Sequence, residues 1–405
     1  MKTRSRKEST LCVVNYPLSP RVRGWIPLGK LFDTIQPLYE TIYLVTGNLP
    51  PGTIKHANVV VVGNFSVEIE RRRHLPLLIA FPIWLFNFLK GQAFLSWNLC
   101  RAARHTNKVL FFLGSVPSLI PVLLAKAMGK QVTTFVIDYL PESMGAGYGK
   151  RARLFYRLLT LLNYRLSDRL VIETESTMQW CRMEPHKAKV RAGAQLYVDT
   201  DRFHVSQPYE SRGNTIGYLG RLTAEKGILQ LLKAIPLLYK DWPDVKFVIG
   251  GDGILRDEVR RSIDELGIAD RVEMRGWIPF AELPQFYNQM KLMVAPSFTE
   301  TGIPVAVLEA MGYGTPVLLT AVGGVEDVVK DGLNGFILRG NSPSEIASGM
   351  NRALRQPDLK HVSDNARRTA EEGFSLEATR ARYRAIFLDD RSLNIAAYIE
   401  ERTSP

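Results

Sequence analysis

Two glutamates, Glu300 and Glu309, flank an apolar segment in the sequence APSFTETGIPVAVLEAMGYGTPVL, which covers residues 295–318. An ionised glutamate is rarely tolerated in apolar surroundings without a partner. The residues beside Glu309 are Leu308 and Ala310, so its carboxylate is expected to face a polar ligand. The pair therefore predicts a site in which a polar group lies between two acids.

Two cations follow a predicted strand in NTIGYLGRLTAEKGILQLLKAI, residues 214–235. Gly220 allows close backbone approach at the end of the strand, and Arg221 and Lys226 lie beside the start of the next helix. Cations beside the unpaired N–H groups of a helix N-terminus form an anion site, most naturally for phosphate. Solvated charges on a surface loop are the alternative.

Two more loops follow strands in the same half of the chain. VIGGDGILRDEV places Gly251 after a strand, although a tight turn also explains such a glycine cluster. VEMRGWIPFAELPQFY places Trp277 and Ile278 in a loop whose backbone could contact the edge of a nucleobase. Core packing by Trp277 is the alternative.

Pro304 is a typical residue for the first turn of a helix. A helix starting there puts Gly302 and Ile303 at its cap, where their N–H groups are free to bind a ligand. Glu309 then lies within the same helix.

These residues are positioned by apolar strands that alternate with helix-length segments along all 405 residues. Strands without clean polar alternation, separated by helices, indicate parallel sheets covered on both faces. The fold class predicted is α/β, with two doubly wound Rossmann-like domains facing a ligand cleft. The polar linker and the change in charge place the domains at 1–208 and 209–405. A C-terminal helix at about 374–400 is expected to cross back to the first domain.

The excess of positive over negative charge lies entirely in the first half of the chain. Residues 1–210 contain 28 Lys and Arg against 14 Asp and Glu, whereas residues 211–405 contain 24 against 26. Such a surface suits an anionic membrane or substrate. The sequence contains no recognition helix, zinc-finger spacing or RNA-binding motif, so nucleic acid is not an expected partner.

A basic and apolar segment at residues 71–108 suits membrane contact. Its uncharged run, residues 75–89, is shorter than the roughly 20 residues that span a bilayer, so we expect it to lie in the membrane interface. A core helix with solvated ends is the alternative. The residues expected to contact the membrane are Arg71, Arg72, Arg73, Trp84, Phe88 and Trp97.

The compartment is predicted from the cysteines and the N-terminus. Three cysteines without metal-ligand spacing indicate a reducing environment, and the charged start of the chain runs into a strand without a signal-peptide apolar region. We therefore expect a cytoplasmic protein, peripheral on the cytoplasmic face of the cell membrane.

The acceptor side of the site is expected in NYPLSPRVRGWIPLGKL, after the first strand. Arg21, Arg23 and Gly24 lie where they could bind an anionic acceptor or donor phosphates, with solvated charges as the alternative. Together with the membrane segment, they suggest a phosphate-bearing lipid acceptor, such as a polyprenyl-phosphate-linked sugar or a phosphatidylinositol-type lipid.

The motifs GR…EKG, GGDG, RGWIP, PSFTETGIPVAVLEAMGYGTPVL and VGGVEDVVKDGLNGFIL occur in this order over residues 214–340. In this order they resemble the donor domain of the retaining GT-B glycosyltransferases of family 4, also called glycosyl transferases group 1. The resemblance implies an enzyme that transfers a sugar with retention from a UDP- or GDP-sugar, without a catalytic metal or other cofactor.

The resemblance also implies roles for individual residues. Arg221 and Lys226 would bind the diphosphate and stabilise it as it leaves. Glu309 would accept hydrogen bonds from the ribose hydroxyls, and Glu300 would lie beside the transferred sugar. The N–H groups around Gly302 and Ile303 would contact phosphate and sugar oxygens.

Two positions depart from the family pattern. The family usually has seven residues between its two acids, whereas eight separate Glu300 from Glu309, and the strict register puts Thr301 at the first position. Either the loop bulges or Thr301 takes part of the role. The family often has a histidine near the sugar, and Asp138 in TTFVIDYLPES is the expected substitute.

Other functions remain open at this point. Asp199-Thr200-Asp201 matches the Asp-x-Asp of metal-dependent transferases, but it lies in the polar linker and is interpreted as structural, so no metal site is expected. The main alternative is a membrane-associated pseudo-glycosyltransferase that binds a nucleotide sugar without turnover. A nucleotide-sugar epimerase is a further alternative.

Overall fold

A computed structural model describes residues 8–16, 25–66, 77–112, 118–136, 150–202, 205–300, 302–395 and 397–399. The chain forms two compact units. Unit 1 consists of Met1–Glu173, Cys181–Leu196 and Arg380–Leu393, and unit 2 consists of Thr174–Trp180, Tyr197–Thr379 and Asn394–Pro405.

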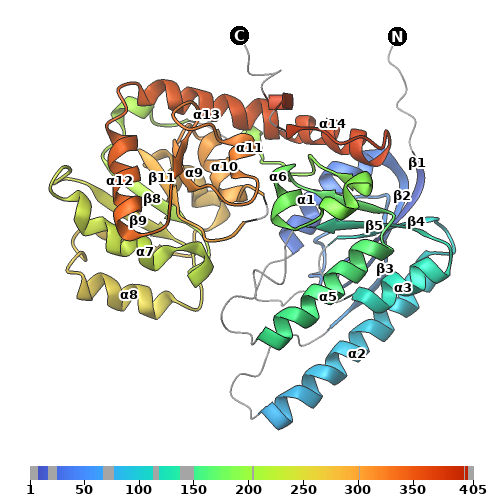
Figure 1. The fold of residues 1–405 in the computed structure, drawn as a ribbon. Helices are drawn as coiled ribbons and strands as arrows, with labels where there is room; N and C mark the ends of the chain where they lie inside the picture. The colour runs from blue at the N-terminus through green and yellow to red at the C-terminus, as the bar shows by residue number, and fades with distance from the viewer. Residues whose placement is uncertain are drawn as a thin grey trace, which may run out of the picture. The chain divides into compact units, whose positions relative to one another are not determined.

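Unit 1 is built on a parallel sheet with the strand order β3-β2-β1-β4-β5-β6-β7 (Figure 1). The chain winds from the middle of the sheet to one edge and then returns to the other side. β1 and β4 therefore adjoin at the topological switch point of a doubly wound fold. The strands are β1 (Glu8–Val14), β2 (Tyr39–Gly47), β3 (Val59–Phe65), β4 (Lys108–Phe111), β5 (Gln131–Val136), β6 (Arg169–Ile172) and β7 (Val190–Arg191).

Helices cover both faces of the unit 1 sheet. Successive residues of a strand point to opposite faces, and the apolar side chains on each face are buried under helices. Val13 packs in a cluster with Phe32 of α1 and Tyr383 of α14. Its neighbour Val14 packs in a second cluster with residues of α2 and α3. α5 lies beside α3. The helices are α1 (Trp25–Ile35), α2 (Leu77–Ala102), α3 (Leu119–Ala127), α5 (Lys150–Leu166) and α14 (Leu376–Phe387).

Unit 2 has a second parallel sheet, in the order β10-β9-β8-β11-β12-β13. β8 and β11 adjoin at its switch point, where Ile216 is in register with Leu292. The strands are β8 (Thr215–Leu219), β9 (Lys246–Gly250), β10 (Val272–Gly276), β11 (Leu292–Ala295), β12 (Val317–Thr320) and β13 (Phe336–Leu338).

Two apolar clusters fill the opposite faces of the unit 2 sheet. One contains residues of α7, α8, α12 and the first turn of α13, and the other contains residues of α9, α10, α11 and the rest of α13. α12 begins at Pro343 because Ser342 and Glu345 form a capping box, each side chain accepting from the other residue's N–H. The helices are α6 (Ser176–Trp180), α7 (Ile228–Ala234), α8 (Arg256–Glu265), α9 (Leu283–Asn288), α10 (Val305–Gly312), α11 (Val325–Val328), α12 (Pro343–Leu354) and α13 (Leu359–Phe374).

The two doubly wound parallel sheets confirm the predicted fold class. The chain passes from unit 1 to unit 2 between Leu196 and Tyr197. The polar linker ahead of residue 209 therefore belongs to unit 2. The segment 380–393 belongs to unit 1, where buried Arg382 donates hydrogen bonds to the carbonyl oxygens of Gly193 and Gln195. The domain boundaries 1–208 and 209–405 and the cleft between the domains stay predictions.

The predicted membrane segment is helical from Leu77 onward, with Pro82 inside the helix. Trp97 is 70% exposed, and Phe88 is half-buried. In the part of the chain that the structure describes, no helix is long and apolar enough to cross a membrane. Arg71, Arg72, Arg73 and the side chain of Trp84 lie outside the described residues.

Candidate functional site

The loops that follow β8 and β11 meet at the carboxyl edge of the unit 2 sheet. β8 ends at Leu219 and β11 at Ala295, and the two strands are neighbours. Open doubly wound sheets bind their ligands at this position, because the chain leaves the two strands in opposite directions. The candidate site is therefore placed by the winding of the sheet.

Lys226 and Glu300 form an ion pair between these two loops. Lys226 Nζ lies 2.5 Å from Glu300 Oε1, and the side chains are only 17% and 14% exposed. The N–H of Phe298 donates to the carbonyl of Glu225 at 2.8 Å, which holds the loops together. Because both side chains are mostly removed from water, leaving either charge unpaired would cost free energy. Each charge therefore requires the other, or a ligand group of opposite charge or with hydrogen-bonding capacity. The pair is suited to a ligand that offers both an anion and a hydroxyl group.

Two glycines permit the close approach of the loops. At Gly251, where φ is +122°, an added Cβ would lie 1.8 Å from the carbonyl oxygen of Gly220. At Gly227, where φ is +68°, it would lie 2.0 Å from the carbonyl oxygen of Pro296. No side chain fits at either position without moving backbone, so these glycines shape the site.

Arg221 differs from Lys226 in its surroundings. Its side chain is 64% exposed and lies 3.5 Å from Glu225, an arrangement that contributes little to stability. Its backbone is better fixed, because the hydroxyl of Tyr218 donates to the Arg221 carbonyl at 2.9 Å. Burial, and then the nearby Glu300, raise the pKa of Tyr218, so this hydroxyl stays a donor. The guanidinium of Arg221 thus projects from a fixed turn into solvent.

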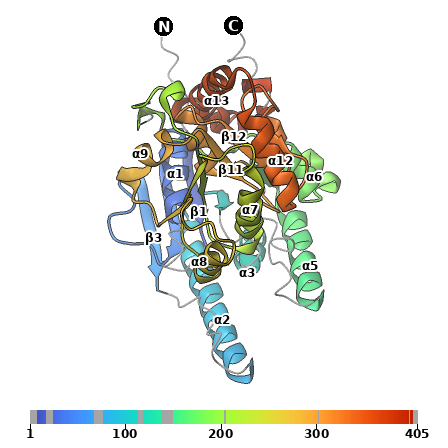
Figure 2. The ribbon, with the colours of Figure 1, turned by 90° about the vertical axis from the view of Figure 1, so that its left-hand side faces the viewer.

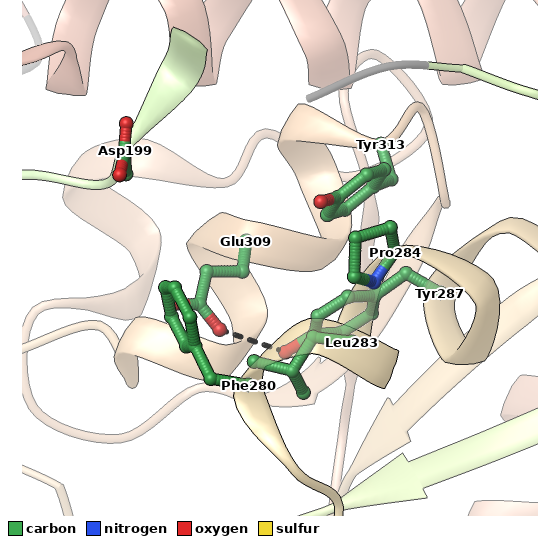
Figure 3. Close-up of a pocket in the computed structure, with 7 residues that line it drawn as sticks. All are labelled: Asp199, Phe280, Leu283, Pro284, Tyr287, Glu309 and Tyr313. Carbon is green, nitrogen blue, oxygen red and sulfur yellow. Dashed lines mark hydrogen bonds between the residues drawn. The ribbon is translucent and has the colours of Figure 1, made fainter. Parts of the chain in front are cut away.

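Glu309 lies on α10 and accepts a hydrogen bond from the hydroxyl of Tyr287. The oxygen atoms are 3.0 Å apart (Figure 3). Burial, with the Glu309 carboxylate next, raises the pKa of Tyr287 well above its usual value. The Tyr287 ring stacks on Tyr313, with their centroids 5.3 Å apart. Tyr287 therefore remains neutral and holds one carboxylate oxygen of Glu309 in place.

A small pocket lies beside Glu309, with a volume of about 30 Å³. Such a volume holds about two water molecules. Asp199, interpreted from the sequence as structural, contributes a second carboxylate to it. The lining residues are Asp199, Phe280, Leu283, Pro284, Tyr287, Glu309 and Tyr313 (Figure 3).

Arg212 fixes the backbone of two residues that line this pocket, Tyr313 and, through Thr315, Tyr287. It is buried and donates to the Tyr313 carbonyl at 2.7 Å and to Thr315 Oγ1 at 2.9 Å. Thr315 in turn donates to the Tyr287 carbonyl at 3.1 Å. Burial lowers the pKa of Arg212 to about 10, which leaves it charged at neutral pH. Sequence reasoning missed Arg212 and both tyrosines, because no local pattern distinguishes them from ordinary core and surface residues.

The start of α10 corrects one expectation. Pro304 is the N-cap of the helix rather than its first residue, since its ψ of 134° is extended. Its carbonyl accepts from the N–H of Val307 at 2.9 Å and from the N–H of Leu308 at 3.2 Å, and the bond from Leu308 is the first intrahelical bond that an N-cap carbonyl accepts. Gly302 and Ile303 precede the cap and are both buried, Ile303 within the core.

The remaining predicted residues have different environments. Trp277 is 53% exposed, so it does not fill the core. Ile278, by contrast, is buried in the apolar cluster that also contains residues of α9 and α10. Residues that the structure describes include no group of three or more His, Cys, Asp or Glu able to hold a metal ion. Of the residues predicted for catalysis and for donor and acceptor binding, five lie outside the described residues: Arg21, Arg23, Gly24, Asp138 and Thr301.

Comparisons of the sequence with known proteins agree with this geometry. A family model described as glycosyl transferases group 1 matches residues 199–370. An uncharacterized glycosyltransferase of Methanocaldococcus jannaschii is 32% identical over 159 residues, 39% of this chain and 40% of the relative. A GDP-mannose-dependent alpha-(1-6)-phosphatidylinositol monomannoside mannosyltransferase of Mycolicibacterium smegmatis is 29% identical over 175 residues, 40% of this chain and 46% of the relative. The chain thus matches less than half the length of these two relatives.

The fold is similar to that of solved structures over nearly the whole chain. HepE from Anabaena, solved in complex with UDP-glucose, superposes with a TM-score of 0.69 at 18% identity, covering 94% of this chain and 99% of that one. At this identity the likeness concerns the GT-B fold alone. The family model thus identifies residues 199–370, which make up most of unit 2, as a domain of glycosyl transferases group 1, the GT-B family 4 that the motifs of this half resemble.

Proposed function

We propose that this chain is a retaining glycosyltransferase. It moves a sugar from a UDP- or GDP-sugar to a lipid-linked acceptor at the cytoplasmic face of the cell membrane, without a catalytic metal. The observation that carries the proposal is the poorly exposed ion pair of Lys226 and Glu300 at the switch point of unit 2. This pair offers a cation for a diphosphate and an acceptor oxygen for a sugar hydroxyl.

The cations supply the main catalytic effect. As the bond between the sugar C1 and the diphosphate oxygen breaks, negative charge develops on the diphosphate. Lys226 and Arg221 stabilise that charge in place of a metal ion. The acceptor oxygen forms the new bond to C1 on the same face, and its proton passes to the departing phosphate. The configuration at C1 is therefore retained.

The other donor contacts follow from the positions of the loops. Glu300 accepts from the transferred sugar, and Glu309, oriented by Tyr287, accepts from the ribose hydroxyls. The N–H groups at Gly302 and Ile303, ahead of α10, contact phosphate and sugar oxygens. Gly220, Gly251, Trp277, Ile278, Thr301 and Pro304 complete the donor site. Asp138 is proposed to take the role of the family's histidine near the transferred sugar.

A lipid-linked acceptor is supported by the basic first half of the chain and by its exposed apolar helix α2. Arg21, Arg23 and Gly24 are proposed to bind its phosphate. The mycobacterial relative named above is described as acting on a phosphatidylinositol mannoside, an acceptor of the same chemistry. Cys12, Cys100 and Cys181 all lie in the described part of the chain and form no disulfide, which agrees with a reducing, cytoplasmic environment.

The first test is a thermal-shift screen of the purified chain against UDP, GDP, ADP and their sugars. One nucleotide at about 100 times its dissociation constant is expected to stabilise the wild type by about 2.7 kcal/mol, or several degrees. Glu309→Ala should lose most of this shift, because the ribose loses its acceptor. Glu265→Ala, at the exposed end of α8, is the matched control and should keep it. If no nucleotide stabilises the wild type, the donor site is wrong and a non-catalytic role replaces the proposal.

Transfer is expected to continue at its full rate in excess EDTA, because protein cations replace the metal at the diphosphate. The measurement is the initial rate of sugar transfer from the donor found in the screen, with and without the chelator. A tenfold loss that Mg²⁺ or Mn²⁺ restores would instead assign a metal-binding role to Asp199 and Asp201.

A further inference from the structure

Three helices cover one face of the unit 1 sheet side by side. α3 contacts both α2 and α5, and both views show the three helices as neighbours (Figures 1 and 2). The inner sides of α2 and α3 share one core cluster, in which Leu99 and Val122 are fully buried, and Leu166 at the end of α5 packs against this cluster. The sides that face away from this cluster therefore form the outer surface of one helical layer.

The outward side of α2 is apolar. Phe86 is 67% exposed, Leu89 50% and Trp97 70%. Ala93, between them, is also exposed. Residues spaced by three or four lie on one side of a helix, so these four form a continuous stripe.

α5 and α3 present stripes of the same kind. The exposed leucines of α5 again recur every three or four residues, and so do the exposed apolar residues of α3. A helix that packs on a sheet normally exposes polar residues on its outer side, so three neighbouring apolar stripes indicate a binding surface. The exposed apolar residues are Leu154, Leu158, Leu161 and Leu162 of α5, and Ile120 and Leu123 of α3.

The charge of the three helices indicates what binds there. Their sequences contain no Asp or Glu, but they contain Lys90, Arg101, Lys126, Lys150, Arg151, Arg153, Arg157 and Arg165. Among those of these side chains that the structure describes, only Lys126 forms an ion pair with an acidic residue, Asp168 at 2.6 Å. A second copy of this chain would bring two basic surfaces together, which is unfavourable. An anionic bilayer both accepts the apolar side chains and attracts the cations.

We propose that the outward sides of α2, α3 and α5 together form the docking surface for an anionic lipid bilayer. The proposal deepens the proposed function, since it names the partner that would present a lipid-linked acceptor. The membrane contact predicted from the sequence covers only residues 71–108. The proposed surface extends it to α3 and to α5, a helix more than 40 residues further along the chain. Binding to the bilayer requires neither a donor nor sugar transfer.

The test is cosedimentation of the full chain with vesicles of phosphatidylcholine, with and without about 30% phosphatidylglycerol. Each basic residue near an anionic surface adds about a fivefold gain in binding, so several should make anionic vesicles at least ~10-fold better. Raising the salt to about 1 M should remove most of this difference, because the Debye length falls to about 3 Å.

Two double variants locate the surface. Phe86→Ser with Trp97→Ser changes α2, and Leu154→Ser with Leu158→Ser changes α5. Each is expected to weaken binding by at least ~10-fold, because two large apolar side chains no longer enter the bilayer. Leu237→Ser with Leu333→Ser is the matched control in unit 2, at positions 54% and 52% exposed, and should bind as the wild type does. All changed positions are exposed, and circular dichroism checks that each variant is folded.

Full binding by the α5 variant would overturn the three-helix surface. So would a lack of vesicle binding by the wild type, or a dimer in sedimentation that both double variants dissociate. The nucleotide screen separates this outcome from failure of the proposed function. A chain that binds anionic vesicles but no nucleotide keeps the docking surface and loses the glycosyltransferase.

Discussion

Lys226→Ala is expected to lower the rate of sugar transfer by about 10²–10³-fold. The loss of one preorganised charge at the developing diphosphate costs about 2.7–4 kcal/mol of transition-state stabilisation. The effect should fall mainly on kcat, because the charge that Lys226 stabilises is largest in the transition state. Steady-state kinetics with the donor from the nucleotide screen provide the measurement.

Two further variants make the Lys226 result specific. Lys233→Ala removes an exposed lysine from α7, in the same unit, and should leave the rate unchanged. Lys226→Ala with Glu300→Gln removes both charges of the pair. If the rate of the single variant fell only because Glu300 was left unpaired, the double variant would recover most of it. A wild-type rate in Lys226→Ala would show that the diphosphate binds elsewhere.

Gly251→Ala is expected to destabilise unit 2 by about 3 kcal/mol or more. The added methyl group would lie 1.8 Å from the carbonyl oxygen of Gly220, and a φ of +122° is strained for any residue with a Cβ. Neither backbone segment can move freely, since the Gly251 N–H also donates to the Gly276 carbonyl. Thermal unfolding should show a fall in Tm of about 6 °C or more.

Gly267→Ala is the matched control for backbone strain alone. Gly267 also has a positive φ, +64°, but nothing lies within 4 Å of an added Cβ. Its substitution should cost only about 1–2 kcal/mol, the usual penalty for a left-handed residue with a side chain. Equal losses at the two positions would mean that conformation alone, and not the contact between the loops, requires Gly251.

The sequence by itself determined the architecture of both units. Apolar runs between helix-length segments predict strands because each strand of a parallel sheet is buried on both faces. The strand predicted ahead of Gly220 is observed as Thr215–Leu219. The strand Val190–Arg191 was missed, because two residues at a sheet edge carry no periodic signal. The order of the motifs also identified the family, since each motif is a local pattern.

The contacts within the candidate site were decided only by the tertiary structure. Lys226 and Glu300 are 74 residues apart, and they meet because β8 and β11 became neighbours at the switch point. The partnership of Tyr287 with Glu309 and the support from Arg212 depend on how α9 and α10 pack. The apolar stripe of α5 became part of a larger surface only once the strand order had placed α5 beside α3. Local patterns encode which face of an element is apolar, but contacts between distant elements depend on strand order and on the close approach that glycines permit.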